Sequence, residues 1–121
     1  MFPILTVANY VHWQGNYDKA FQQAHDEKKV LLVLVVKNKT PLCHEIIRNV
    51  FMNQEYIEKI NMETVAVMVT YEGALTYPIE LYYTTVFPTL FLVNAQNEIF
   101  LSEPLYERNI SVEKVKSILL D

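Results

Sequence analysis

The stretch with the clearest potential for chemistry is Thr40-Pro41-Leu42-Cys43. Cys43 is the single cysteine of the chain, and a cysteine thiolate is a nucleophile. Threonine is a common N-cap and proline is favoured at the first helical position, so the stretch predicts a helix start with Cys43 in the first turn. One hypothesis is that Thr40 and the positive helix end lower the pKa of Cys43. We favour the other, a buried and inert Cys43, because free cysteines are among the most buried residues.

The remaining candidates for reactive or metal-binding side chains are weak. His44 follows Cys43, but adjacent helical residues point about 100° apart, so His44 is a poor general base for that thiol. His12 and His25 have no partner at the spacing of metal ligands. A lone cysteine also excludes an intramolecular disulfide and a zinc site built from thiolates. We therefore predict no metal site and no cofactor.

Length and composition predict a single globular domain covering residues 1–121. Hydrophobic residues make up 51% of the chain and charged residues 20%, with 2 glycines and 5 prolines. Such a composition excludes disordered and collagen-like chains. The formal net charge of −4 disfavours sequence-independent binding of nucleic acid, which depends on clustered Lys and Arg.

The sequence contains no apolar run of the ~18–20 residues needed to cross a bilayer, the longest clear one being residues 30–36. We therefore expect no membrane insertion. The first dozen residues lack the basic segment and the small-residue cleavage site of a signal peptide. This indicates a cytoplasmic protein for the sequence as given, and a periplasmic one if a leader was removed.

Two elements are predicted in the first third of the chain. Helical spacing of apolar residues predicts a helix over residues 17–28, its buried face made of Tyr17, Ala20, Phe21 and Ala24. The unbroken aliphatic run at residues 30–36 is typical of a central strand covered on both faces. A strand of this kind indicates an α/β fold.

A second helix and a second strand follow Thr40. Six apolar residues share one helical face, namely Leu42, Cys43, Ile46, Ile47, Val50 and Phe51. Residues 53–60 either continue this helix or form a short separate one, and residues 64–70 are predicted to be a buried strand.

The last third of the chain has weaker patterns. Residues 71–87 are predicted to be mostly loop, with a turn at Gly73 and a possible short helix from Pro78. Residues 89–93 and 98–101 flank an Asn-rich connector, which predicts an antiparallel hairpin. Val112, Val115, Ile118 and Leu119 predict a terminal helix with Ser111 as its N-cap.

This order of elements, with a proline just before the third strand, resembles thioredoxin. Trp13, Tyr17, Ala20, Ala24 and Lys28-Lys29 before an apolar strand are similar to the start of a thioredoxin-related family that includes periplasmic disulfide reductases. Val50-Phe51, Tyr56-Ile57 and Phe87-Pro88-Thr89 also resemble its motifs. The resemblance implies a three-layer thioredoxin-like α/β fold, a mixed sheet flanked by helices, with a cis peptide bond before Pro88.

One departure from that family bears on function. Thioredoxins carry Cys-x-x-Cys where this chain has Thr40-Pro41-Leu42-Cys43, so the attacking cysteine is replaced by Thr40. Dithiol exchange needs one thiolate to attack and a second thiol to release the mixed disulfide. Leu34 also stands where the family often buries an acid as proton acceptor. Dithiol reductase activity is therefore disfavoured.

Two hypotheses of function follow. The first is a non-catalytic binding or scaffold module that holds a protein or peptide partner at Pro41, Leu42, Phe87 and Pro88. The resemblance to thioredoxins implies that the backbone beside the proline pairs with an extended segment. The second is a monothiol oxidoreductase or peroxide-handling protein in which Cys43 is the nucleophile and Thr40 helps to lower its pKa. In that case glutathione or a partner thiol resolves the adduct.

Overall fold

This computed structural model describes residues 11–52, 54–71 and 77–120. The helices are α1 (Tyr17–Glu27), α2 (Pro41–Phe51), α3 (Gln54–Glu63) and α4 (Val112–Leu120), with one 3₁₀ turn, η1 (Glu107–Asn109). The strands are β1 (Val30–Val36), β2 (Thr64–Thr70), β3 (Thr89–Asn94), β4 (Ile99–Phe100) and β5 (Leu105–Tyr106). No helix in the described ranges is long and apolar enough to span a membrane.

The strands form one mixed sheet in the order β2-β1-β3-β4, and β5 pairs with β3 beside β4. β1 pairs in parallel with β2 over its whole length, from Val30 opposite Thr64 to Val36 opposite Thr70. β1 is antiparallel to β3, and β3 is antiparallel to β4 and β5. The predicted central strand at residues 30–36 and the predicted hairpin are both confirmed.

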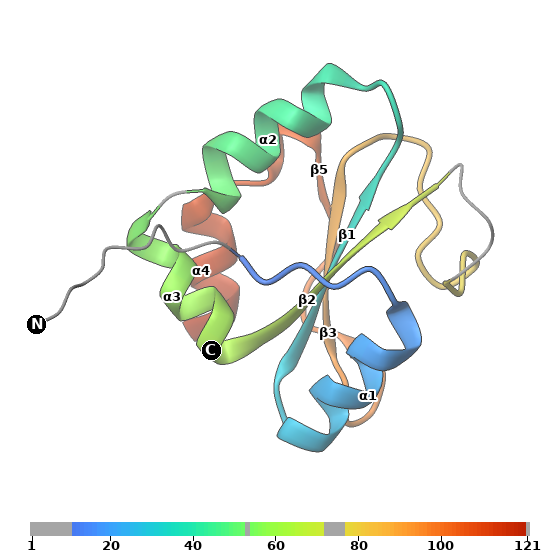
Figure 1. The fold of residues 1–121 in the computed structure, drawn as a ribbon, viewed down its shortest axis with the longest axis vertical. Coiled ribbons are helices and arrows are strands. Elements are labelled where there is room, and N and C mark those ends of the chain that lie inside the picture. Colours follow the sequence, from blue (N-terminus) through green and yellow to red (C-terminus); the bar gives the residue numbers. More distant parts are fainter. Residues whose placement is uncertain (1–10, 53, 72–76, 121) are drawn as a thin grey trace, which may run out of the picture.

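Helices cover both faces of the sheet, which gives three layers (Figure 1). Because side chains alternate along a strand, β1 sends Leu32 and Leu34 to one face and Leu31 and Val33 to the other. The first face packs against α2, α3 and α4, and the second against α1 and the aromatic residues that follow position 76. Both cores are almost completely shielded from solvent, since residues 31–35 of β1 are 0% exposed.

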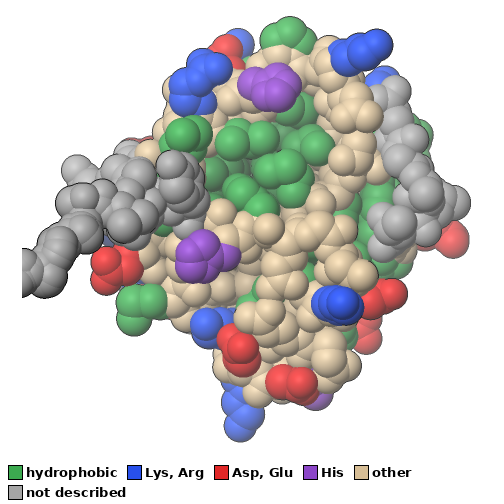
Figure 2. Space-filling view, viewed as in Figure 1, with side chains coloured by type: hydrophobic (Ala, Val, Ile, Leu, Met, Phe, Trp, Pro, Cys, Tyr) green, Lys and Arg blue, Asp and Glu red, His purple; other side chains and the backbone are tan. Residues whose placement is uncertain are grey.

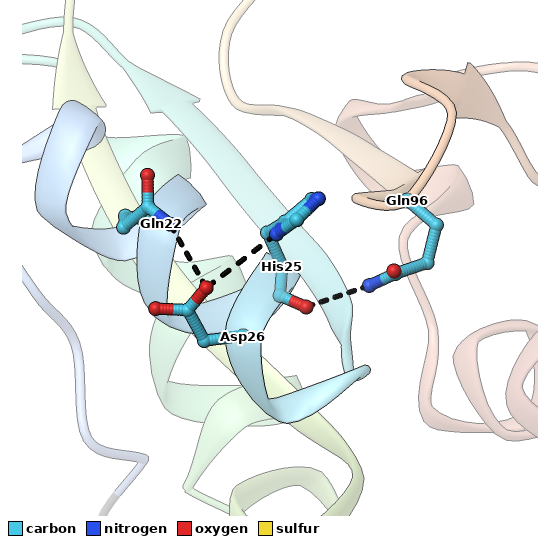
Figure 3. A network of polar contacts seen from close by, with 4 residues as sticks. All are labelled: Gln22, His25, Asp26 and Gln96. Carbon is cyan, nitrogen blue, oxygen red and sulfur yellow. Dashed lines mark hydrogen bonds and ion pairs between the residues drawn. The ribbon is translucent and has the colours of Figure 1, made fainter.

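α1 forms where the spacing of Tyr17, Ala20 and Ala24 predicted it. The Asn16 side chain caps its start by accepting the Lys19 N–H at 3.0 Å, and Lys28 ends it in the left-handed region at φ 57°. Polar contacts then tie its last turn to the β3–β4 turn (Figure 3): Gln96 Nε2 donates to the His25 carbonyl oxygen at 2.8 Å. The His25 side chain is exposed, and its Nδ1 lies 3.5 Å from Asp26 Oδ1.

The rest of the α1 face is covered by tyrosines instead of a helix. Tyr82 is 1% exposed, its hydroxyl lies 2.8 Å from that of Tyr17, and its ring packs on Phe91. Pro78 begins a turn, in which Leu81 N–H donates to its carbonyl oxygen at 3.0 Å, and not the short helix considered for this position. The turn predicted at Gly73 lies outside the described residues.

The β4 edge of the sheet holds the elements that sequence patterns missed. After β4 the chain leaves the ladder at residues 102–104 and returns as β5, and the η1 turn follows. Pro104 in this interruption cannot donate a ladder hydrogen bond, so the edge is poorly suited to pairing with another strand. Two-residue strands carry no readable alternation, which explains why β5 was not predicted.

The opposite edge is β2, which the segment before α1 covers in part. Gln14 bridges β2 there, since its N–H donates to Ala66 O at 2.8 Å and its carbonyl accepts from Met68 N–H at 3.0 Å. Trp13 stands next to it and packs edge-on against Phe51 at 5.2 Å. Figure 2 shows hydrophobic side chains gathered in a hollow on this face, beneath α2.

Candidate functional site

The predicted start of the second helix is present at the end of β1. Thr40 is the N-cap residue of α2, with extended backbone angles (φ −111°, ψ 104°), and Pro41 is the first helical residue. The Thr40 side chain does not cap the helix, however, and its hydroxyl lies 3.5 Å from the Asn38 carbonyl oxygen. The expected capping hydrogen bond of the Thr40 side chain is therefore absent. Local acceptors compete for a threonine hydroxyl, and Asn38 holds it here.

Cys43 lies in the third helical position and is 4% exposed. Its side chain belongs to the core between α2 and the sheet, together with Val36 and Ile46. Burial raises the pKa of the Cys43 thiol, and a backbone hydrogen bond with Lys37 opposes that rise only in part. The thiol is therefore protonated at neutral pH, which runs against the hypothesis of a lowered pKa.

Neither of the two positions considered for a proton-transfer group supplies one to the sulfur. Leu34, where the resemblance implies a buried acid, is 0% exposed among aliphatic residues. His44 is exposed on the outer side of α2. Within the described ranges, no group of three or more His, Cys, Asp or Glu residues could hold a metal ion.

The second part of the site is the loop that enters β3. The peptide bond between Phe87 and Pro88 is cis, as the resemblance implies. Pro88 is buried, whereas Phe87 is half-buried and its ring lies 5.1 Å from that of Tyr71. The resemblance to thioredoxin indicated both Phe87 and Pro88 but not the groups that fix them.

Two buried threonines hold this loop in place. The hydroxyls of Thr84 and Thr89 lie 3.0 Å apart, and the Val86 carbonyl oxygen is within hydrogen-bond distance of both, at 3.0 and 2.8 Å. On the far side, the Pro88 carbonyl accepts the Glu107 N–H at 2.8 Å. Thr89 is 0% exposed, so its hydroxyl needs these partners. The only sequence signal that could have indicated this hydroxyl pair is the presence of two threonines close to Pro88, one of them directly after it.

Lys37 joins the two parts of the site. Its backbone bonds to Cys43, while its Nζ lies 5.8 Å from the centre of the Phe87 ring. The start of α2 and the Phe87–Pro88 loop therefore lie side by side at one end of the sheet (Figure 1). Pro41 is exposed and Leu42 is half-buried beside them.

Of the other tyrosines in this region, Tyr77 and Tyr82 pack into the α1 face of the core. Tyr83 is 62% exposed and lines a shallow open groove with Val86 and Tyr106. The groove borders the Phe87–Pro88 loop through Val86. Tyr77 and Tyr82 therefore belong to the core, whereas Tyr83 and Tyr106 lie at the surface.

Comparison with protein families identifies the chain. The sequence model of the Thioredox_DsbH family, described as protein of unknown function DUF255, matches residues 3–88. The chain belongs to the Thioredox_DsbH family. The match spans the start of α2 and ends at Pro88, so it contains both parts of the candidate site. No curated protein sequence gives a significant match.

Solved structures show the thioredoxin-like fold of this Thioredox_DsbH chain. A DsbH oxidoreductase superposes with a TM-score of 0.75 at 17% identity, covering 99% of this chain and 92% of that chain. A thioredoxin from Thermus thermophilus gives 0.71 at 14% identity, with 92% and 85% covered. Thioredoxin O2 from Arabidopsis thaliana, in the oxidized state, gives 0.60 at 17% identity, with 86% and 84% covered.

Proposed function

We propose that this Thioredox_DsbH chain is a non-catalytic binding module that holds an extended segment of a protein or peptide partner. The observation that carries the proposal is the contrast in solvent exposure between two neighbouring residues of the site. Cys43, the only sulfur that could exchange, is 4% exposed, while Pro41 beside it is at the surface. The partner would lie between the start of α2 and the Phe87–Pro88 loop.

Catalysis would demand features that the sulfur lacks. A thiolate must form and reach its target, and a second thiol must release the adduct. Burial raises the pKa of Cys43, and the chain holds no second cysteine. The sulfur therefore acts as a small apolar group in the core under α2.

Binding a partner requires only an accessible apolar surface and a loop of fixed conformation, and the protein has both. Leu42 and Phe87 present half-buried apolar side chains, and the open groove at Tyr83 and Tyr106 extends this surface. The Thr84–Thr89 hydroxyl pair fixes the loop in advance. A preformed loop loses little conformational entropy when a partner binds, which favours affinity. An extended segment can also pair with the backbone next to Phe87.

A monothiol activity of Cys43 remains the competing function, because the sulfur is at the positive end of α2 and has a hydrogen bond with the Lys37 backbone. Glutathione or a partner thiol would have to resolve the adduct. This function needs the first turn of α2 to open so that the thiol meets solvent. Its signature is therefore fast alkylation of Cys43 in the folded protein.

Affinity capture with a matched pair of variants tests the binding module. Phe87→Asp places a charge in the proposed groove, whereas Ile99→Asp places the same charge on β4, where Ile99 is 60% exposed. We expect Phe87→Asp to lose partners that the wild type and Ile99→Asp both retain, with circular dichroism confirming that each variant is folded. An unchanged set of partners with Phe87→Asp would count against the proposal.

A further inference from the structure

We propose that the surface between the start of α2 and the Phe87–Pro88 loop, which we call the groove, selects extended segments in which apolar residues alternate with aspartate or glutamate. This inference rests on the proposed binding function and specifies the chemistry of the partner. It comes from the charges around the groove, which differ in sign from the formal net charge of −4 of the whole chain.

The segment that leads into α2 is basic and contains no acid. From Val30 to His44 the sequence has no Asp or Glu, and Lys37 and Lys39 lie just before α2. Neither lysine takes part in any of the four ion pairs formed by described residues. Both ammonium groups therefore remain available to an external carboxylate.

The helix behind them adds to the positive potential. The first turn of α2 has no acidic residue, and a helix N-terminus carries about half a positive charge. The nearest acid along α2 is Glu45, and Arg108 of η1 pairs with it directly. Glu107 also lies beside the loop, where its N–H binds Pro88. The balance of these groups is still positive on the side of Lys37 and Lys39.

A cationic and an apolar group lie close together here. Lys37 Nζ is 5.8 Å from the Phe87 ring, and the exposed Pro41 follows Lys39 by two residues. An apolar side chain resting on Phe87 would thus have its chain neighbours within reach of an ammonium group. Because side chains of an extended segment alternate between two sides, alternating apolar and acidic residues suit this surface best.

The attraction acts only at short range. At physiological salt the Debye length is about 8 Å, so the negative charges elsewhere on the chain are largely screened from an acidic segment that lies in contact with the lysines. Selection for carboxylates should then weaken as salt rises. Two lysines are too few for the clustered charge that nucleic acid binding requires, which favours a peptide as the occupant.

The test uses two fluorescent eight-residue peptides, acetylated and amidated at their ends. In one, aspartate alternates with leucine and phenylalanine, and in its twin asparagine replaces every aspartate. We expect the wild type to bind the aspartate peptide at least about 10-fold more tightly in 50 mM salt, and the difference to shrink in 500 mM salt. The double variant Lys37→Glu/Lys39→Glu should lose this preference.

A matched control keeps the net charge equal. Lys28 has left-handed backbone angles like Lys39 (φ 57° and 61°), and Lys116 Nζ lies over the Tyr56 ring at 5.4 Å, much as Lys37 lies over Phe87. The double variant Lys28→Glu/Lys116→Glu should bind both peptides like the wild type. An equal loss of the preference in this control would overturn the inference, because the net charge alone would then explain it.

Phe87→Gln separates failure of the inference from failure of the binding function. If both peptides bind the wild type equally and Phe87→Gln weakens both, the groove binds peptides but does not select acids, so the inference is wrong. If neither peptide binds, or Phe87→Gln changes nothing, the inference and the proposed function fail together. Tighter binding of an eight-nucleotide oligothymidylate than of the aspartate peptide would assign the surface to nucleic acid and would also overturn the inference.

Discussion

The two parts of the candidate site differ in how far solvent reaches them. On what we call the sulfur side, Cys43 is 4% exposed and packs under α2 with aliphatic residues. On what we call the proline side, Pro41 is exposed and Phe87 half-buried, and Lys37 covers part of the Phe87 ring. Both sides belong to one junction, where the end of β1 and the start of β3 meet α2.

Under the proposed function, this difference separates the reactive part of the site from the part that binds a partner. The sulfur side depends on exposure and on the pKa of one thiol. The proline side depends on loop geometry, which the buried Thr84 and Thr89 hydroxyls maintain without any cysteine. A chain can therefore lose the first and keep the second, which is the basis of the proposed function.

The largest expected contrast comes from placing one carboxylate on each side. Cys43→Asp buries a charge that has no partner and should lower the free energy of unfolding by about 3–5 kcal/mol. Pro41→Asp places the same group at the exposed first position of α2, where the helix dipole favours it, and should change the free energy by less than about 1 kcal/mol. Urea unfolding followed by circular dichroism measures both. Similar effects would show that the sulfur side is as open as the proline side.

Peptide affinity should respond in the opposite order, with a larger effect from a substitution on the proline side than from one on the sulfur side. Phe87→Gln is expected to weaken binding of the alternating aspartate peptide by at least about 10-fold, which corresponds to about 1.4 kcal/mol. Cys43→Ala should leave that affinity within about twofold while lowering stability by about 1 kcal/mol, the cost of deleting one buried heavy atom. Fluorescence anisotropy reports the affinities. A loss of affinity with Cys43→Ala would mean that the partner contacts the sulfur.

A smaller effect is expected from pH, because burial raises the pKa of the Cys43 thiol. Below the pKa of an unfolded thiol, about 8.5, both states hold the proton and the folded state keeps its full stability. Above it the unfolded state ionises first, so the free energy of unfolding falls as pH rises, by at most about 1.4 kcal/mol per pH unit. Under reducing conditions between pH 8 and 9.5, Cys43→Ala should show a flatter dependence. Parallel curves for the two proteins would indicate an unburied thiol.

The smallest contrast concerns the helix caps. Asn16 caps α1 through its side chain, so Asn16→Ala should cost about 1 kcal/mol. Thr40 occupies the N-cap of α2 without such a hydrogen bond, so Thr40→Ala should cost only a few tenths of a kcal/mol. Thermal unfolding monitored by circular dichroism compares them. A cost for Thr40→Ala equal to that for Asn16→Ala would show that the Thr40 hydroxyl supports the sulfur side after all.

The sequence was sufficient where a local pattern determines the structure. Seven consecutive aliphatic residues predicted β1 at the bounds observed, and the spacing of Tyr17, Ala20 and Ala24 predicted α1 to within one residue. Proline after threonine located the start of α2. These elements form because one or both of their faces are buried. The spacing of the apolar residues along the sequence indicates which faces those are.

The sequence was insufficient where contacts between distant residues, or the rotamer of a single side chain, determine the structure. The Tyr17–Tyr82 hydroxyl pair joins residues 65 positions apart, and the contact of Lys37 with Phe87 also bridges separate elements. The direction of the Thr40 hydroxyl is one choice among local acceptors. The location of the site at Pro88 came from the resemblance to thioredoxin, since period and composition carry no sign of it.

The measurement that tests the central claim most directly is the rate of alkylation of Cys43 by iodoacetamide between pH ~5 and ~9, in the folded protein and in urea. We predict labelling of the folded protein at least about 100-fold slower than of the unfolded chain at pH 8, because only transient opening of α2 exposes the thiol. Fast labelling of the folded protein, with a midpoint well below the ordinary thiol value of about 8.5, would contradict the account and would support a monothiol enzyme.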